Sequence, residues 1–199
     1  MSGLVFGEMK GIKEVKETGA DRFAESPLGR SVERQEFKFS ESEYDKSLVK
    51  ETEKNCPVEH GHWEGERGNS KWYPDPDYIP QKSNPENKTW EDILKKYGID
   101  GVCFVDGEPD FGEISKGNVE IDGFSERRED NFDKADIALA EQRGCSPEEV
   151  KKWRKEHGYT WHECRDMKTM QKVPAEVHNN IPHSGGISEI KKESRENGT

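Results

Sequence analysis

The stretch YTWHECRDMKTMQKVPAEVHNNIPHSGG, residues 159–186, decides the fold that we expect for the second half of this chain. Residues 159–161 are aromatic and β-branched, which favours a strand. Residues 165–168 are polar and predict a turn. The alternation of apolar and polar residues over 170–173 predicts a second strand that pairs with the first. Pro174 suits the first position of a helix, so the predicted unit is a β-hairpin followed by a short helix.

Three of the six histidines of the chain fall in this stretch. We expect His162 at the end of the first strand, His178 on the helix and His183 just after it. Imidazole binds divalent transition metals well, and three rings on neighbouring elements can converge on one ion. The residues alone also allow two simpler interpretations, which are ordinary polar side chains of a hairpin and a purely structural zinc site.

The same stretch resembles the ββα-metal nuclease site of the HNH superfamily. It is most similar to the WHH-type toxin nucleases at the C-termini of bacterial polymorphic toxins. The resemblance rests on Trp-His-x-x-x-Asp, Met-Gln-x-Val-Pro and His-x4-His-Ser-Gly-Gly. The residues that carry it are Trp161, His162, Asp166, Met170, Gln171, Val173, Pro174, His178, His183, Gly185 and Gly186. Residues 72–158 resemble the region that precedes the motif in such toxins.

The sequence departs from the family pattern at two points. Glu163 stands where the family has a second histidine, which leaves open the side chain that acts as general base. The middle asparagine of the HNH motif, which pins the hairpin loop, has no match between His162 and His178. Thr169 or Gln171 is the expected substitute.

The resemblance implies an HNH-type endonuclease, a phosphodiester hydrolase that uses one divalent ion (Mg²⁺, Mn²⁺ or Zn²⁺) and cleaves DNA in preference to RNA. The implied metal ligands are His162, His178 and His183, and the implied catalytic residues are His162 and Glu163. By position in the motif, His162 is the ligand and Glu163 the general base, and we favour this assignment. By chemistry, imidazole is the better base near neutral pH, and a carboxylate binds Mg²⁺ or Mn²⁺ readily.

Further residues complete the expected site. Asp166 is expected to orient an imidazole or the turn, and Trp161 to support the strand. The chain has a net charge of −11, but residues 151–172 hold seven basic residues against three acidic ones. Phosphate binding needs such local positive charge. The expected phosphate contacts come from Lys168, Arg165 and Lys172.

Other polar residues have no assigned chemistry. The four cysteines are too far apart for a CxxC motif, and Cys164 is expected to be a packed thiol. Glu108, Asp110 and Glu113 are expected to be surface charge. His60 and His62 lie in a stretch rich in glycine and proline, where we expect ordinary loop histidines.

The expected fold class is α+β, in which the C-terminal hairpin-helix unit packs on a small helical and β region. Only 29% of the 199 residues are hydrophobic and 37% are charged, so we expect one modest core and a flexible or disordered lead at residues 1–55. Thr89 and Gly98 bound one predicted helix. The nuclease domain is expected at 56–199, divided into a loop-rich and small-sheet part (56–126), two helices (127–158), the ββα-metal motif (159–186) and a polar, fraying tail (187–199).

No stretch approaches the roughly 18–20 apolar residues of a membrane helix, and residues 1–16 lack the apolar core of a signal peptide. The resemblance therefore implies delivery by a dedicated secretion system, action in the cytoplasm of a target cell, and a cognate immunity protein. The competing hypothesis is a non-catalytic module that binds nucleic acid or a protein partner and uses the histidines as a structural metal site.

Overall fold

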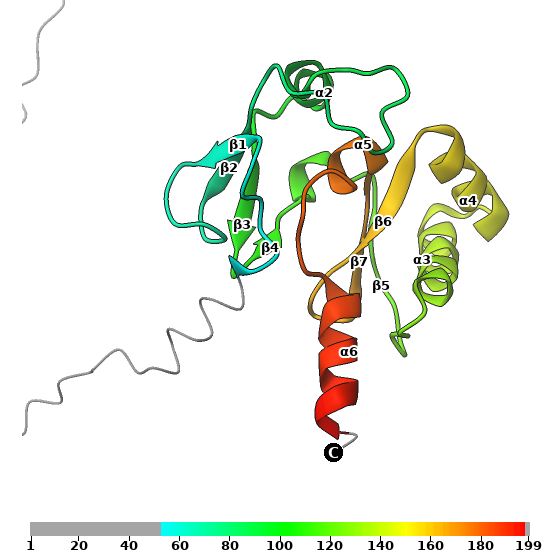
Figure 1. The fold of residues 1–199 in the computed structure, drawn as a ribbon. Helices are drawn as coiled ribbons and strands as arrows, with labels where there is room; N and C mark the ends of the chain where they lie inside the picture. Colours follow the sequence, from blue (N-terminus) through cyan, green and yellow to red (C-terminus); the bar gives the residue numbers. More distant parts are fainter. Residues whose placement is uncertain (1–52, 198–199) are drawn as a thin grey trace, which may run out of the picture. The chain divides into compact units, whose positions relative to one another are not determined.

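The computed structural model describes residues 53–197, so the expected lead at residues 1–55 lies almost entirely outside the described residues. The described part has the α+β fold that the sequence predicts, with two small antiparallel sheets and helices between and after their strands (Figure 1). No helix within residues 53–197 combines the length and the apolar character that crossing a membrane requires.

The first sheet is built from the strands β1 (Gly61–Trp63), β2 (Lys71–Pro74), β3 (Val102–Val105) and β4 (Glu108–Pro109), in that order. Helix α2 (Trp90–Tyr97) lies between β2 and β3 in the chain. As predicted, its N-cap is Thr89, whose hydroxyl accepts from the Asp92 amide, and it ends at Gly98 with a φ of 73°. Trp72, Trp90 and Phe104 join these elements in one buried core, to which Val173 and Val177 also belong.

The predicted hairpin is present as β6 (Tyr159–Glu163) and β7 (Thr169–Pro174), and His162 lies opposite Gln171. The small sheet expected within residues 56–126 is present as β1 to β4, but one further strand of this region joins the hairpin. Strand β5 (Asn118–Glu120) pairs with β7, and the second sheet has the order β5-β7-β6. Val119 of β5 lies opposite Met170 and both are buried in a second core, so the apolar hairpin face gains a neighbouring strand.

Two helices cover the second sheet, as the sequence predicts for residues 127–158. They are α3 (Arg128–Arg143) and α4 (Pro147–Glu156), and Ser146 and Glu149 form a capping box at the start of α4. Between them and β6 lies a buried polar triad, in which Asp136 accepts from Arg154 at 2.7 and 3.1 Å and from the indole of Trp161 at 2.8 Å. This triad fixes β6 against both helices.

The end of the chain differs from the expected fraying tail. After β7, the short helix α5 (Ala175–His178) forms as predicted, and a second helix, α6, occupies Gly186–Asn197 (Figure 1). This polar segment is rich in lysine, glutamate and arginine, and these residues have high helix propensity. Glu189 of α6 also accepts from Arg165 at 3.0 Å, which ties the helix to the hairpin turn.

Candidate metal centre

The hairpin and α5 bring three histidines together, as the sequence predicts. His162 lies near the end of β6, His178 is the last residue of α5, and His183 lies in the loop before α6. The centres of the three rings are 4.9 to 5.3 Å apart. One ligand nitrogen of each ring lies within 4.8 Å of the other two, so the rings can hold a metal ion between them.

The outer ring nitrogens of two of these histidines face oxygen acceptors. His178 Nδ1 lies 3.0 Å from Asn179 Oδ1, and His183 Nδ1 lies 2.7 Å from the carbonyl oxygen of Ile181. Because these oxygens accept, each Nδ1 carries the proton and each Nε2 keeps its lone pair, as metal-binding histidines require. His178 Nε2 is 3.3 Å from His162 Nδ1, which is about the spacing of two nitrogens on a tetrahedral zinc ion.

Burial keeps the rings of His178 and His183 neutral. It lowers the pKa of His178 well below its usual value, and charge on the neighbouring His183 and His162 would lower it further. Burial, followed by the neighbouring His162, lowers the pKa of His183 to about 4. Phe111 contributes to this environment because its ring centre lies 5.0 to 5.8 Å from those of all three histidines. Neutral imidazole is the form that binds a metal, so His178 and His183 are ready to bind near pH 7.

Glu163, the positional candidate for general base, lines the same pocket but is bound to α3. Its carboxylate accepts from Asn131 Nδ2 at 2.8 Å and from Arg128 Nε at 2.9 Å. Burial raises the pKa of Glu163, and these two partners oppose the rise. Consecutive strand residues project to opposite faces, so Glu163 and His162 diverge from the end of β6.

The two residues expected to support the site lie outside the histidine cluster. Trp161 is buried and donates to Asp136, so it holds the strand rather than the metal ligands. Asp166 closes the hairpin turn, where it accepts from Thr169 Oγ1 at 2.6 Å and from the amides of Thr169 and Lys168. Burial would raise the pKa of Asp166, but these hydrogen bonds outweigh it and the pKa is lowered. Asp166 and Thr169 thus pin the loop.

The structure does not bring the three expected phosphate contacts to the histidines. Lys168 pairs with Glu120 at 2.6 Å on the hairpin turn, and Arg165 pairs with Glu189. Lys172 is buried against the ring of Trp153, and burial lowers its pKa to about 8. Lys172 lies opposite Trp161 in the hairpin, so both side chains are on the same face of the sheet, which is the face that packs on the helices.

The pocket of about 580 Å³ beside the histidines contains other cationic groups. Arg128, at the start of α3, and Lys82 both line it. The N-terminus of α6 also lies at this pocket, and the first amides of a helix favour anions. Gly185 and Gly186 allow this approach, because a Cβ there would lie 2.6 Å and 2.7 Å from the carbonyl oxygens of Glu163 and Cys164.

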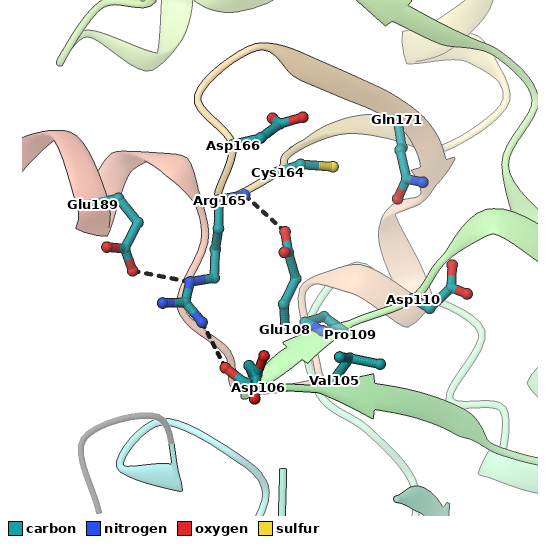
Figure 2. Close-up of a pocket in the computed structure, with 10 residues that line it drawn as sticks. All are labelled: Val105, Asp106, Glu108, Pro109, Asp110, Cys164, Arg165, Asp166, Gln171 and Glu189. Carbon is teal, nitrogen blue, oxygen red and sulfur yellow. Dashed lines mark hydrogen bonds and ion pairs between the residues drawn. The ribbon is translucent and has the colours of Figure 1, made fainter. Parts of the chain in front are cut away.

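A different pocket adjoins His162 on its other side. Glu108, expected to be surface charge, is brought there by β4, and its Oε1 lies 3.6 Å from His162 Nε2. The same Oε1 accepts from the Arg165 amide at 2.8 Å, and Figure 2 shows this contact beside the thiol of Cys164. Sequence reasoning missed Glu108 and Arg128, because each lies more than 30 residues from His162 in the chain.

The three histidines of the hairpin, α5 and the following loop thus form a candidate metal site. Residues 102–185 match the model of a family described as the DNase/tRNase domain of colicin-like bacteriocins. This part of the chain is therefore similar to a nuclease toxin domain, and the match includes all three histidines. No curated protein matches the chain.

Proposed function

We propose that this protein is a metal-dependent endonuclease toxin of the HNH (ββα-metal) type, similar to the WHH toxins, and that its substrate is DNA. The observation that carries the proposal is the convergence of His162, His178 and His183 within the segment that matches the colicin-like nuclease family. The donor set suits the ion, because the outer nitrogens of two rings face acceptor oxygens and leave Nε2 available.

The three histidines are the proposed metal ligands. A divalent ion held there acts as a Lewis acid that neutralises phosphate charge and stabilises the leaving oxygen. The chain contributes the position of this charge, since β6, α5 and the loop before α6 each supply one ring. Phe111 shields the rings from water on one side, which strengthens electrostatic interactions in the pocket.

Arg128, Lys82 and the first amides of α6 are the proposed phosphate contacts. All three line the pocket that contains the histidines. The Arg128 side chain is 54% exposed, whereas its partner Glu163 is 2% exposed, so the guanidinium can meet a phosphate while the buried carboxylate holds it in place. These groups take the place of Lys168, Arg165 and Lys172, which were expected from the sequence to contact phosphate.

Glu163 has two possible roles. Burial raises the pKa of Glu163, which is the direction that a general base working at neutral pH requires. Both of its oxygens accept hydrogen bonds, however, and the Arg128 partner is a cation that opposes protonation. We therefore favour a role in positioning Arg128, and we keep His162 as a metal ligand, as its place in the motif implies.

The family match also supports proposals about export, site of action and protein partner. The colicin-like match favours export, action inside a target cell and a cognate immunity protein. RNA is the alternative substrate, since the description of the family includes both DNase and tRNase domains. The competing function is a non-catalytic binding module with a structural metal site, and the histidine cluster alone is compatible with it.

The decisive experiment incubates the protein with plasmid DNA or with tRNA, in Mg²⁺, Mn²⁺ or Zn²⁺ and then in EDTA. We expect cleavage that EDTA abolishes. His178→Ala and His183→Ala should each abolish cleavage and lower metal affinity by at least about tenfold. His60→Ala is the matched control, because His60 stacks on Tyr78 outside the cluster. Binding without cleavage, or full activity in both variants, would overturn the proposal.

A further inference from the structure

The second ring nitrogen of His162 is an unsatisfied polar atom in the interior. His162 is 1% exposed, and its Nε2 has no hydrogen-bond partner among residues 53–197. The nearest carboxylate oxygen, Glu108 Oε1, is 3.6 Å away, which is too far for a hydrogen bond. A buried polar atom without a partner is costly, so this nitrogen points to a missing ligand.

Two other metal donors surround this nitrogen. Cys164 follows His162 by two residues and lies directly after the end of β6. The Cys164 thiol, the Glu108 carboxylate and the His162 ring each offer a ligand atom, and these atoms lie within 4.8 Å of one another. A nitrogen and an oxygen on a tetrahedral zinc ion are about 3.3–3.5 Å apart, so the 3.6 Å separation of His162 Nε2 and Glu108 Oε1 is closer to that of a shared ion than to that of a hydrogen bond.

We propose that Glu108, His162 and Cys164 form a second metal site, for zinc or another thiophilic divalent ion, on the opposite side of His162 from the three-histidine site. A thiolate, an imidazole and a carboxylate are a donor set that zinc accepts, whereas Mg²⁺ prefers oxygen ligands. Binding releases the Cys164 proton to solvent, because a coordinating thiol is deprotonated. Glu108 and Cys164 line the adjoining pocket (Figure 2), from which water would reach a bound ion as a further ligand.

The charges around this second site favour a cation. Asp106, Asp110, Asp166 and Glu189 line the same pocket. The one cationic side chain among its lining residues, Arg165, is engaged elsewhere, since its guanidinium donates to Glu189 and to the carbonyl oxygen of Asp106. The Arg165 amide donates a hydrogen bond to Glu108 Oε1. The other carboxylate oxygen, Oε2, is then a further atom that can bind the metal.

The two sites compete for His162. Neutral imidazole has one lone pair and one N–H group. When Nε2 binds an ion at the second site, Nδ1 carries the proton and faces His178 Nε2, and the three-histidine site loses a ligand. A thiophilic metal should therefore inhibit the enzyme. This consequence rests on the proposed nuclease function, whereas the second site itself does not.

Cobalt(II) provides the test, because a bound thiolate gives a charge-transfer absorption band that histidine ligands do not give. We expect the band when Co²⁺ is titrated into the metal-free full chain. Cys164→Ala and Cys164→Ser should both remove it, and Glu108→Gln should weaken Co²⁺ binding by at least about tenfold. Cys103→Ser is the matched control, since Cys103 is an exposed cysteine outside the site. Circular dichroism melting verifies that each variant is folded.

The double variant His178→Ala/His183→Ala separates the two sites. It should retain the band and bind Co²⁺ at least as tightly as the wild type, since the competing site is gone. Loss of the band there would make Cys164 an accessory ligand of the three-histidine site and overturn the proposal. Absence of the band in the wild type, or its survival in both Cys164 variants, would also overturn it. A band in a protein without nuclease activity would leave the second site standing and reject only the proposed function.

Discussion

Arg128 and Glu163 form an ion pair of 2.9 Å that joins the first residue of α3 to the last residue of β6. The carboxylate is buried and the guanidinium reaches the pocket of the histidines. A cation is therefore held at a fixed place beside the candidate metal centre. Removal of either partner would leave the other in the wrong place or without its counter-charge.

This pair makes a prediction about Glu163. If Glu163 positions Arg128, Glu163→Gln and Arg128→Ala should both raise KM for the nucleic acid and weaken its binding, with little change in metal affinity. A general base would instead show a fall in kcat of about 10²- to 10⁴-fold at an almost unchanged KM in Glu163→Gln. Steady-state kinetics and calorimetric metal titration of the two variants separate these outcomes.

The double variant Glu163→Gln/Arg128→Ala provides the control for that prediction. Residues that act as a unit are not additive, so the double variant should lose little more than the worse single variant. Fully additive losses would show that the two residues act independently and would contradict the positioning role.

The buried triad predicts a large effect on stability. Asp136→Ala should lower the free energy of unfolding by about 3–5 kcal/mol, because it leaves Arg154 as an unpaired buried charge and Trp161 without its acceptor. Urea unfolding measures this change. Asp133→Ala is the matched control, since its pair with Lys151 is exposed and should contribute little to stability. Equal effects of the two substitutions would contradict the role of the triad.

The histidine cluster predicts how the stability of the metal-free protein depends on pH. The pKa of His183 is about 4 in the folded chain, against about 6.5 when unfolded, so the unfolded chain binds more protons between these values. Stability should be complete above about pH 6.5 and fall as the pH drops toward about 4, with up to about 3 kcal/mol from this residue. Urea unfolding in EDTA across this range measures the slope.

His183→Gln should flatten that slope, because glutamine does not titrate. His178 contributes with the same sign, since its folded pKa is also lowered. An unchanged slope in His183→Gln would show that other groups control the acid sensitivity. Excess Zn²⁺ should steepen the dependence on pH, because protons and metal compete for the same nitrogens.

The contacts of residues 53–55 predict where the chain can be shortened. Glu53 pairs with Arg67 at 3.5 Å, and Asn55 donates to Ser184, the neighbour of His183, at 2.6 Å. Removal of residues 1–52 should preserve cooperative melting and cleavage, whereas removal of residues 1–55 should lower cleavage. Loss of cooperative melting in the shorter deletion would place residues 1–52 in the folded core.

The features that could be predicted from the sequence are those formed by residues close together in the chain. The hairpin, α5 and the three histidines follow from local patterns within 28 residues, and Thr89 and Gly98 mark the bounds of α2. The pairing of β5 with β7 was not predictable in this way, because Asn118 and Gln171 meet only when the whole domain folds. The same limit applies to Glu108 and Arg128.

Predictions failed where they rested on the charge content of a segment and not on the direction in which its side chains point. The basic residues of the hairpin suggested phosphate contacts, but the alternation of the strand turns Lys172 toward the core. The polarity of residues 187–197 suggested fraying, although the same residues have high helix propensity and one of them pairs with Arg165. Counting charges does not reveal the direction in which each side chain points.

The close approach of Gly185 to the carbonyl oxygen of Glu163, the last residue of β6, offers a practical route to an inactive form of the protein. A single methyl group at Gly185 would press on the carbonyl oxygen of Glu163 and push the segment around His183 outward. Gly185→Ala should thus abolish cleavage through this steric clash, while every charged and metal-binding side chain remains. Such a variant would keep the charged surface of the protein, so it could be produced in quantity and used to search for the proposed immunity protein.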